Sequence, residues 1–222
     1  MKYPIGYLKR NMNVNNNQDF ASIVDKLKKN KDAFVREDLA KFLRYINNEH
    51  SLEVLKELVA DRNYLVQIEA IESLYAFPYE KAADVVLDQI HSRHPLVRGY
   101  VYEYICDMCS DREEAKRILL TVNETHTWAK IHLLICQAVL TGNHQVKQLV
   151  TMYGKCSYLN QTTMLNSFNY YYDLLNTDDQ KIIKCFVQKQ EGKSRPVAVE
   201  EAFARLTKHI SVDQHCSSQT FL

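Results

Sequence analysis

The sequence predicts an all-α fold, an α-solenoid of about five to six stacked helical hairpins. Related residues recur about every 31 positions along the 222-residue chain. Only five glycines and four prolines are present, which favours helices over loops and sheets. Within each period the apolar residues follow helical spacing. A fixed period of this size is typical of stacked copies of one supersecondary unit.

The repeat is visible in columns of residues that recur in step. One column holds Phe34, Leu65, Leu96, Trp128 and Leu159, with spacings of 31, 31, 32 and 31. Another holds Leu39, Ala70, Val101, Leu133 and Met164. The one spacing of 32 places an extra residue in the turn at 108–112. We interpret both columns, including Trp128, as core positions.

The first three hairpins follow from local signals. The first contains a helix over 20–29, with Asp19 as its N-cap, and a second helix over 34–46. The second hairpin runs over 50–77 and is stopped by Pro78. The third runs over 80–108, with Pro95 in the first turn of its second helix, where the missing N–H has no cost.

The fourth hairpin is expected over 113–140, with Gly142 as a C-cap, and the fifth over 144–175. A sixth, degenerate hairpin has helices over 179–190 and 196–210 and caps the stack. These elements predict an irregular N-terminal segment over 1–18, a repeat domain over 19–210 and a flexible tail over 211–222.

The second helices resemble HEAT repeats, in particular the short HEAT-like type seen in bilin-lyase-like proteins. The similarity lies in 31–36, 62–67 and 93–98, followed by Ala70 and Leu74 at the spacing of the family pattern. It covers roughly residues 19–175. The resemblance implies a right-handed superhelix whose second helices line a concave face. It does not specify a function, because many functions share this fold.

Composition excludes some functions and leaves others open. The formal net charge of +1 gives no field that would attract nucleic acid. No run of about 18 apolar residues is present, so we expect no membrane span. The first residues lack the apolar block of a signal peptide, and we expect a cytoplasmic protein with its six cysteines reduced.

A polar column repeats in step with the apolar ones. Arg36, Gln67, Arg98 and Lys130 each lie six residues after a polar or acidic residue, namely Asn30, Asp61, Ser92 and Glu124. We interpret the two columns as a ladder that ties the repeats together, because basic and acidic members recur jointly. A cationic groove for phosphates or acidic partners is the alternative.

The sequence predicts no catalytic residue, metal or cofactor. Cys106 and Cys109 form a CxxC, but a zinc site needs two further ligands at set spacing. His94 and His126 share a column and leave a metal site as an alternative. No GxSxG, Gly-rich phosphate loop or HExxH is present. We therefore expect a protein that is not an enzyme.

An enzymatic alternative rests on resemblance. Trp128 invites comparison with HEAT-like alkylpurine DNA glycosylases, which use aromatic residues and an Asp on a basic concave face. Here Trp128 falls in a repeat column, and His132 rather than an acid stands four residues on. A bilin-lyase activity is implied by the fold resemblance alone.

The helix over 128–140 departs from the repeat because it is apolar all round. Ile131 and Ile135 fall on the face expected to point outward. Such a helix is either buried on both sides or available to a partner. The last repeat or the tail could cover this patch, two copies of the chain could meet there, or a partner could dock.

We therefore predict a non-enzymatic module that binds a partner protein or peptide on its concave face. The predicted binding residues occupy the outward columns of the second helices: Arg44, Glu72, Tyr75, Tyr102, Glu103, Ile131, Ile135, Asn166 and Tyr170. An inhibitor or immunity protein that blocks one enzyme or toxin is an alternative within the same binding class.

Overall fold

A computed structural model describes residues 17–142 and 145–217. These residues form twelve α-helices, with short 3-10 segments and no strand among them. The predicted all-α solenoid is therefore confirmed. The predicted irregular segment over 1–18 lies mostly outside the described residues.

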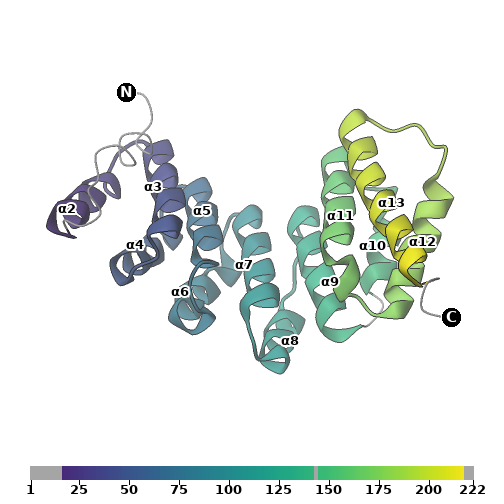
Figure 1. Cartoon of the computed structure of the whole chain (residues 1–222), viewed down its shortest axis with the longest axis horizontal. Coiled ribbons are helices and arrows are strands. Elements are labelled where there is room, and N and C mark those ends of the chain that lie inside the picture. Colours follow the sequence, from purple (N-terminus) through teal and green to yellow (C-terminus); the bar gives the residue numbers. More distant parts are fainter. Residues whose placement is uncertain (1–16, 143–144, 218–222) are drawn as a thin grey trace. The chain divides into compact units, whose positions relative to one another are not determined.

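The chain divides into two compact units, residues 1–110 and 111–222. Unit 1 contains α2 (Asn17–Leu27), α3 (Ala33–Ile46), α4 (Glu49–Val59), α5 (Tyr64–Leu74), η1 (Tyr79–Lys81), α6 (Ala83–Leu87), η2 (Asp88–His91) and α7 (Pro95–Met108). The second helices α3, α5 and α7 pack side by side, and α4 and α6 form a second layer (Figure 1).

Unit 2 contains α8 (Arg112–Thr121), α9 (Thr127–Thr141), α10 (Gln145–Tyr153), α11 (Tyr158–Tyr171), η3 (Tyr172–Leu174), α12 (Thr177–Gln190) and α13 (Val197–Ser217). Here α9, α11 and α13 pack in succession, and α8, α10 and α12 belong to the other layer. Each unit thus repeats one pattern of paired helices.

Short polar side chains begin the second helices at the positions where the repeat predicts a turn. Asp32 Oδ1 accepts a bond from the Phe34 N–H at 3.0 Å, and Asn63 Oδ1 accepts one from the Leu65 N–H at 2.9 Å. These bonds satisfy N–H groups that have no partner within the helix. Gly142 follows α9 with a φ of 63°, so the predicted glycine C-cap is confirmed.

Three predicted boundaries are wrong. α2 begins at Asn17, so Asp19 lies inside the helix instead of capping it. The helix expected at the start of the third hairpin is broken into η1, α6 and η2, and no side chain caps α6 at Ala82. α13 continues to Ser217, so residues 211–217 are helical where a tail was predicted.

The core follows one predicted column and not the other. Leu39, Ala70, Val101, Leu133 and Met164 are all buried. The Phe34 column is not core: Phe34 and Leu159 are each 71% exposed and Leu65 is 38% exposed, while Leu96 and Trp128 are only partly buried. Five residues separate the two columns, which is about 140° around a helix. The Phe34 column therefore points away from the core at the first turn of each second helix.

Candidate functional site

The polar column lies at the turns between paired helices. Its side chains donate to the carbonyl oxygen six residues earlier: Arg36 Nη1 to Asn30 O at 2.7 Å, Gln67 Nε2 to Asp61 O at 2.7 Å and Arg98 Nη1 to Ser92 O at 2.8 Å. Each bond closes the turn that joins a first helix to its second helix. These three bonds lie within single repeats, and the predicted tie between repeats is seen for Arg36, which reaches Asp61 of the next repeat.

One member of the ladder also joins two repeats. The Arg36 guanidinium meets the Asp61 carboxylate through bonds of 2.7 and 2.8 Å. The Arg36 side chain is 3% exposed and that of Asp61 is 9% exposed. Burial acts to raise the pKa of Asp61, but hydrogen bonds from Arg36 and the Asn63 N–H outweigh it and lower that pKa.

Burial removes three of the predicted binding residues. Ile131 and Ile135 have no exposed surface, and every residue of α9 from 131 to 138 is buried. Tyr102 is also fully buried. The expectation that these side chains anchor a partner, or that the two isoleucines join two copies of the chain, is therefore wrong. The all-round apolar composition of α9 marks a buried helix.

Two further predicted residues lie on α11 in unit 2. Asn166 Oδ1 accepts a bond of 3.1 Å from Arg205 Nη2, so the last helix α13 already engages this side chain. Tyr170 is 66% exposed, and its ring meets that of Tyr171 edge to face. Both residues are exposed.

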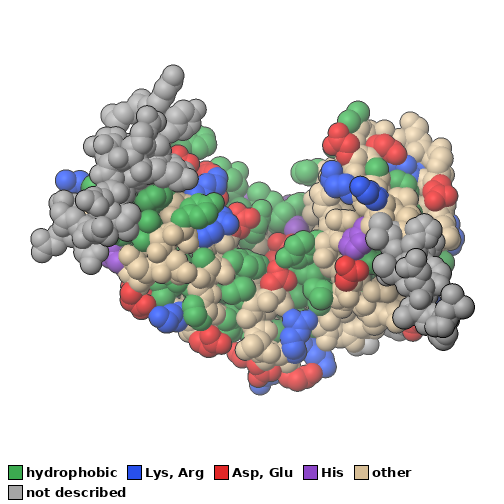
Figure 2. Space-filling view, viewed as in Figure 1, with side chains coloured by type: hydrophobic (Ala, Val, Ile, Leu, Met, Phe, Trp, Pro, Cys, Tyr) green, Lys and Arg blue, Asp and Glu red, His purple; other side chains and the backbone are tan. Residues whose placement is uncertain are grey.

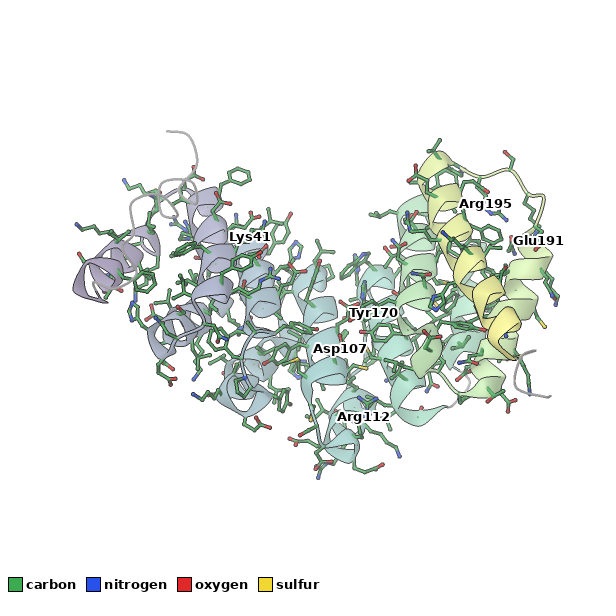
Figure 3. All side chains as sticks on the ribbon, in the orientation of Figure 1. Lys41, Asp107, Arg112, Tyr170, Glu191 and Arg195 are labelled. Atoms are coloured by element: carbon green, nitrogen blue, oxygen red, sulfur yellow. The ribbon has the colours of Figure 1, made fainter. Side chains whose placement is uncertain are left out.

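The remaining predicted residues, Arg44, Glu72, Tyr75 and Glu103, lie on α3, α5 and α7 of unit 1. We name the surface that these helices share, on the side of Lys41 and Glu72, the α3/α5/α7 face. Figure 3 labels Lys41 on this face and Asp107 near the end of α7. Tyr75 lies at the edge of the face, where its hydroxyl donates to Asp107 Oδ2 at 3.4 Å.

A charged cluster occupies the centre of this face. Its five carboxylates are Glu37, Asp38, Glu69, Glu72 and Glu103. Its two cations are Lys41 and Arg44, which gives the cluster a formal charge of −3. Lys41 Nζ bonds Glu37 at 2.9 Å and Glu69 at 3.2 Å, and Arg44 Nη2 lies 3.4 Å from the other Glu69 oxygen.

Burial raises the pKa of several acids in the cluster. The pKa of Glu72 is raised because burial outweighs the attraction of Arg44 and Lys41, and the charge of Glu103 raises it further. Burial likewise raises the pKa of Glu69 and of Asp38. The pKa of Tyr100 rises to about 12 because of burial and the charges of Glu72, Glu103 and Glu69. More cation would stabilise this face.

Apolar side chains border the charged cluster. Phe34 and Leu65 are exposed in the first turns of α3 and α5, Leu96 is partly buried at the same position of α7, and Tyr45 is 73% exposed at the end of α3. Figure 2 shows apolar, acidic and basic side chains next to one another over this part of the molecule. The α3/α5/α7 face thus combines an apolar edge with an acidic centre.

Sequence reasoning missed Glu69, Tyr100 and the apolar edge. Glu69 and Tyr100 share a column with Asp38, one turn from the predicted Glu72 and Glu103, so the column itself was the available signal. Phe34 and Leu65 were missed because their regular recurrence resembled a core position.

The cysteines and histidines considered above as metal ligands pack within the fold. Cys106 and Cys109 are buried at the end of α7. His94 stacks on Tyr64 with ring centroids 3.7 Å apart and an interplanar angle of 7°. Within the described residues, no group of three or more His, Cys, Asp or Glu side chains is placed to hold a metal ion.

Comparison with known proteins places the first repeats in a family. The family model of HEAT repeats matches residues 20–106. Residues 20–106 are therefore similar to HEAT repeats. This stretch contains almost all of the described helices of unit 1 and the whole charged cluster. The resemblance inferred from the second helices is thereby confirmed for these repeats.

Other comparisons add little. A crystal structure titled as an engineered protein, Northeast Structural Genomics Consortium target OR329, is similar at 17% identity and a TM-score of 0.41, covering 87% of this chain and 97% of that chain. A search of curated proteins found no matching sequence. No helix among the described residues combines the length and hydropathy required to cross a bilayer.

Proposed function

We propose that the protein is a non-enzymatic binding module that docks a partner protein or peptide on the α3/α5/α7 face. HEAT-type solenoids offer extended surfaces made of equivalent positions on successive helices. The observation that carries the proposal is the exposure of Phe34 and Leu65 at equivalent positions on neighbouring helices, next to a charged cluster. Large apolar side chains grouped on a surface mark interaction sites.

Roles within the face follow from side-chain chemistry. Phe34, Leu65 and Tyr45 supply apolar contact area that is already ordered by the helices. Arg44, Glu72 and Glu103 set the orientation of the partner through charge. Contacts of the first kind supply most of the affinity, and those of the second kind determine specificity and association rate.

Capture from a lysate of the native cell tests the proposal. The full chain, a Phe34→Ser/Leu65→Ser variant and a Leu120→Ser control are immobilised, and bound proteins are compared by mass spectrometry. Leu120 is 49% exposed on α8, outside the face. We expect proteins that bind the wild type and the control to be lost from the double variant. Identical capture by all three would show that the face is not the binding site.

Identification of the captured partner also separates the two binding classes. If the partner is an enzyme whose activity falls on addition of this protein, the chain acts as an inhibitor of the immunity type. If the partner is not inhibited, the chain acts as an adaptor.

A further inference from the structure

We propose that the occupant of the α3/α5/α7 face is a basic amphipathic helix of a partner protein, with apolar residues seven positions apart. The inference rests on the proposed function and adds the chemistry and the secondary structure of the partner. It derives from two features of the face, the spacing of its apolar edge and the sign of the charge beside that edge.

The apolar edge has a regular spacing. Phe34, Leu65 and Leu96 are each the second residue of a second helix, and these helices pack directly against one another. Packed helices lie about 8–10 Å apart. The three side chains therefore form a row with steps of about 8–10 Å, running across the axes of α3, α5 and α7.

The upper end of this step is close to the spacing of one face of an α-helix. Seven residues of helix advance about 10.5 Å and return to nearly the same face. In an extended strand, residues on one face recur at about 7 Å or about 13 Å, which are farther from the upper end of the step. A partner helix laid along the row would place an apolar residue at each step.

The charge beside the row determines which side chains are favoured on the facing flank of that helix. Asp38 and Glu69 follow the row by four residues, and Glu72 and Glu103 follow it by seven, so all four lie on the same side of the apolar edge. With Glu37, Lys41 and Arg44 included, the charged cluster keeps its formal charge of −3. Lysine or arginine on the facing flank would complement this charge, and acidic residues there would be repelled.

The presence of Lys41 and Arg44 on the face does not remove the expected preference for lysine or arginine on the partner helix. Lys41 is engaged with Glu37 and Glu69, and Arg44 with Glu69. Glu69 is 5% exposed, so its two ion pairs tie α3 to α5 beneath the surface. Asp38 and Glu72 are more accessible than Glu69, and the pKa of each is raised by burial. An incoming cation should therefore gain the most favourable interaction energy beside these two carboxylates.

The test measures binding of synthetic peptides to the full chain by fluorescence anisotropy. One fluorescein-labelled peptide of about 20 residues carries Leu at every seventh position, Lys along one adjacent flank and Ala elsewhere. A matched peptide carries Glu in place of each Lys. We expect the Lys peptide to bind, with affinity falling about tenfold as salt rises from low to high, and the Glu peptide to show no binding.

Variants locate the binding on the face. Asp38→Asn/Glu72→Gln should weaken the Lys peptide about threefold to tenfold, as the loss of two partly screened ion pairs implies. Phe34→Ser/Leu65→Ser should weaken it about tenfold or more. Glu53→Gln/Glu57→Gln removes the same charge from α4, where both side chains are exposed, and should leave binding unchanged. Circular dichroism confirms that each variant is folded.

The outcomes separate this inference from the proposed function. Equal weakening by the α4 control, or binding of both peptides alike, would mean unspecific attraction and would overturn the basic-helix assignment. If native partners depend on Phe34 and Leu65 but the Lys peptide does not bind, the basic-helix assignment fails and the docking face stands. If the Phe34→Ser/Leu65→Ser variant captures the same native proteins as the wild type, both the proposed function and this inference fail.

Discussion

The Arg36 side chain makes two interactions that stabilise the fold. It closes the turn between α2 and α3 through Asn30 O, and it joins the first repeat to the second through Asp61. Removing it by Arg36→Ala leaves the buried Asp61 carboxylate without the opposite charge beside it and the Asn30 carbonyl without this donor. We expect a loss of about 3–5 kcal/mol in the free energy of unfolding, measured by urea denaturation followed by circular dichroism.

Arg62 offers a matched control for this prediction. It is exposed and donates one bond of 3.2 Å to Lys31 O, also across the first two repeats. Arg62→Ala should cost no more than about 1 kcal/mol, because exposed polar contacts contribute little. Similar losses for the two variants would show that the Arg36–Asp61 pair is not the tie between the repeats.

Single residues show how far the sequence alone could be interpreted. The polar column was predictable because its members recur with the repeat. Its bonds at an offset of six residues go to backbone carbonyl oxygens, and the tie between repeats is seen for Arg36. The exposure of Phe34 was not predictable from recurrence, since a repeat conserves surface positions as well as core positions. Its angle of about 140° from Leu39 was the available signal.

Among the elements, α3, α5 and α7 share a face whose partly buried carboxyl groups make stability depend on pH. The pKa of Glu72 is raised above its ordinary value of 4.5 by burial. The folded state therefore holds the Glu72 proton more strongly than the unfolded state does. This contribution to stability is fully present below pH 4.5 and is lost as pH rises through the folded pKa.

Glu72→Gln isolates that contribution. The variant has no charge to desolvate, so we expect it to gain stability relative to the wild type at pH 7.5 and to gain less at pH 5. Urea unfolding of both proteins at the two pH values measures the difference. A gain that is larger at pH 5 than at pH 7.5 would contradict the sign of the pKa shift.

The burial of the outward face of α9 could not be predicted from the repeat register. A helical wheel gives the direction of Ile131 and Ile135 but not how far neighbouring side chains reach over them. The buried run from 131 to 138 shows that these two residues complete a core instead of forming a surface. Composition, which is apolar all round, was the better guide here than the repeat register.

For the whole molecule, the 31-residue period predicted the stack of hairpins, and its one spacing of 32, at 108–112, falls where the chain divides into units 1–110 and 111–222. A period reports what each repeat shares with its neighbours. A departure from the period, in contrast, marks a position where one repeat differs from the others.

Unit 1 should fold as a separate fragment. It contains three pairs of helices, the number that a repeat stack needs for a stable core. Leu39, Leu55, Ile71 and Val101 within it are fully buried. We expect residues 1–110 to remain helical and to melt cooperatively, as measured by circular dichroism at 222 nm. A fragment of residues 1–78, which has only two pairs, should lose that cooperativity. A broad melt of the longer fragment would instead mean that the fold of unit 1 depends on unit 2.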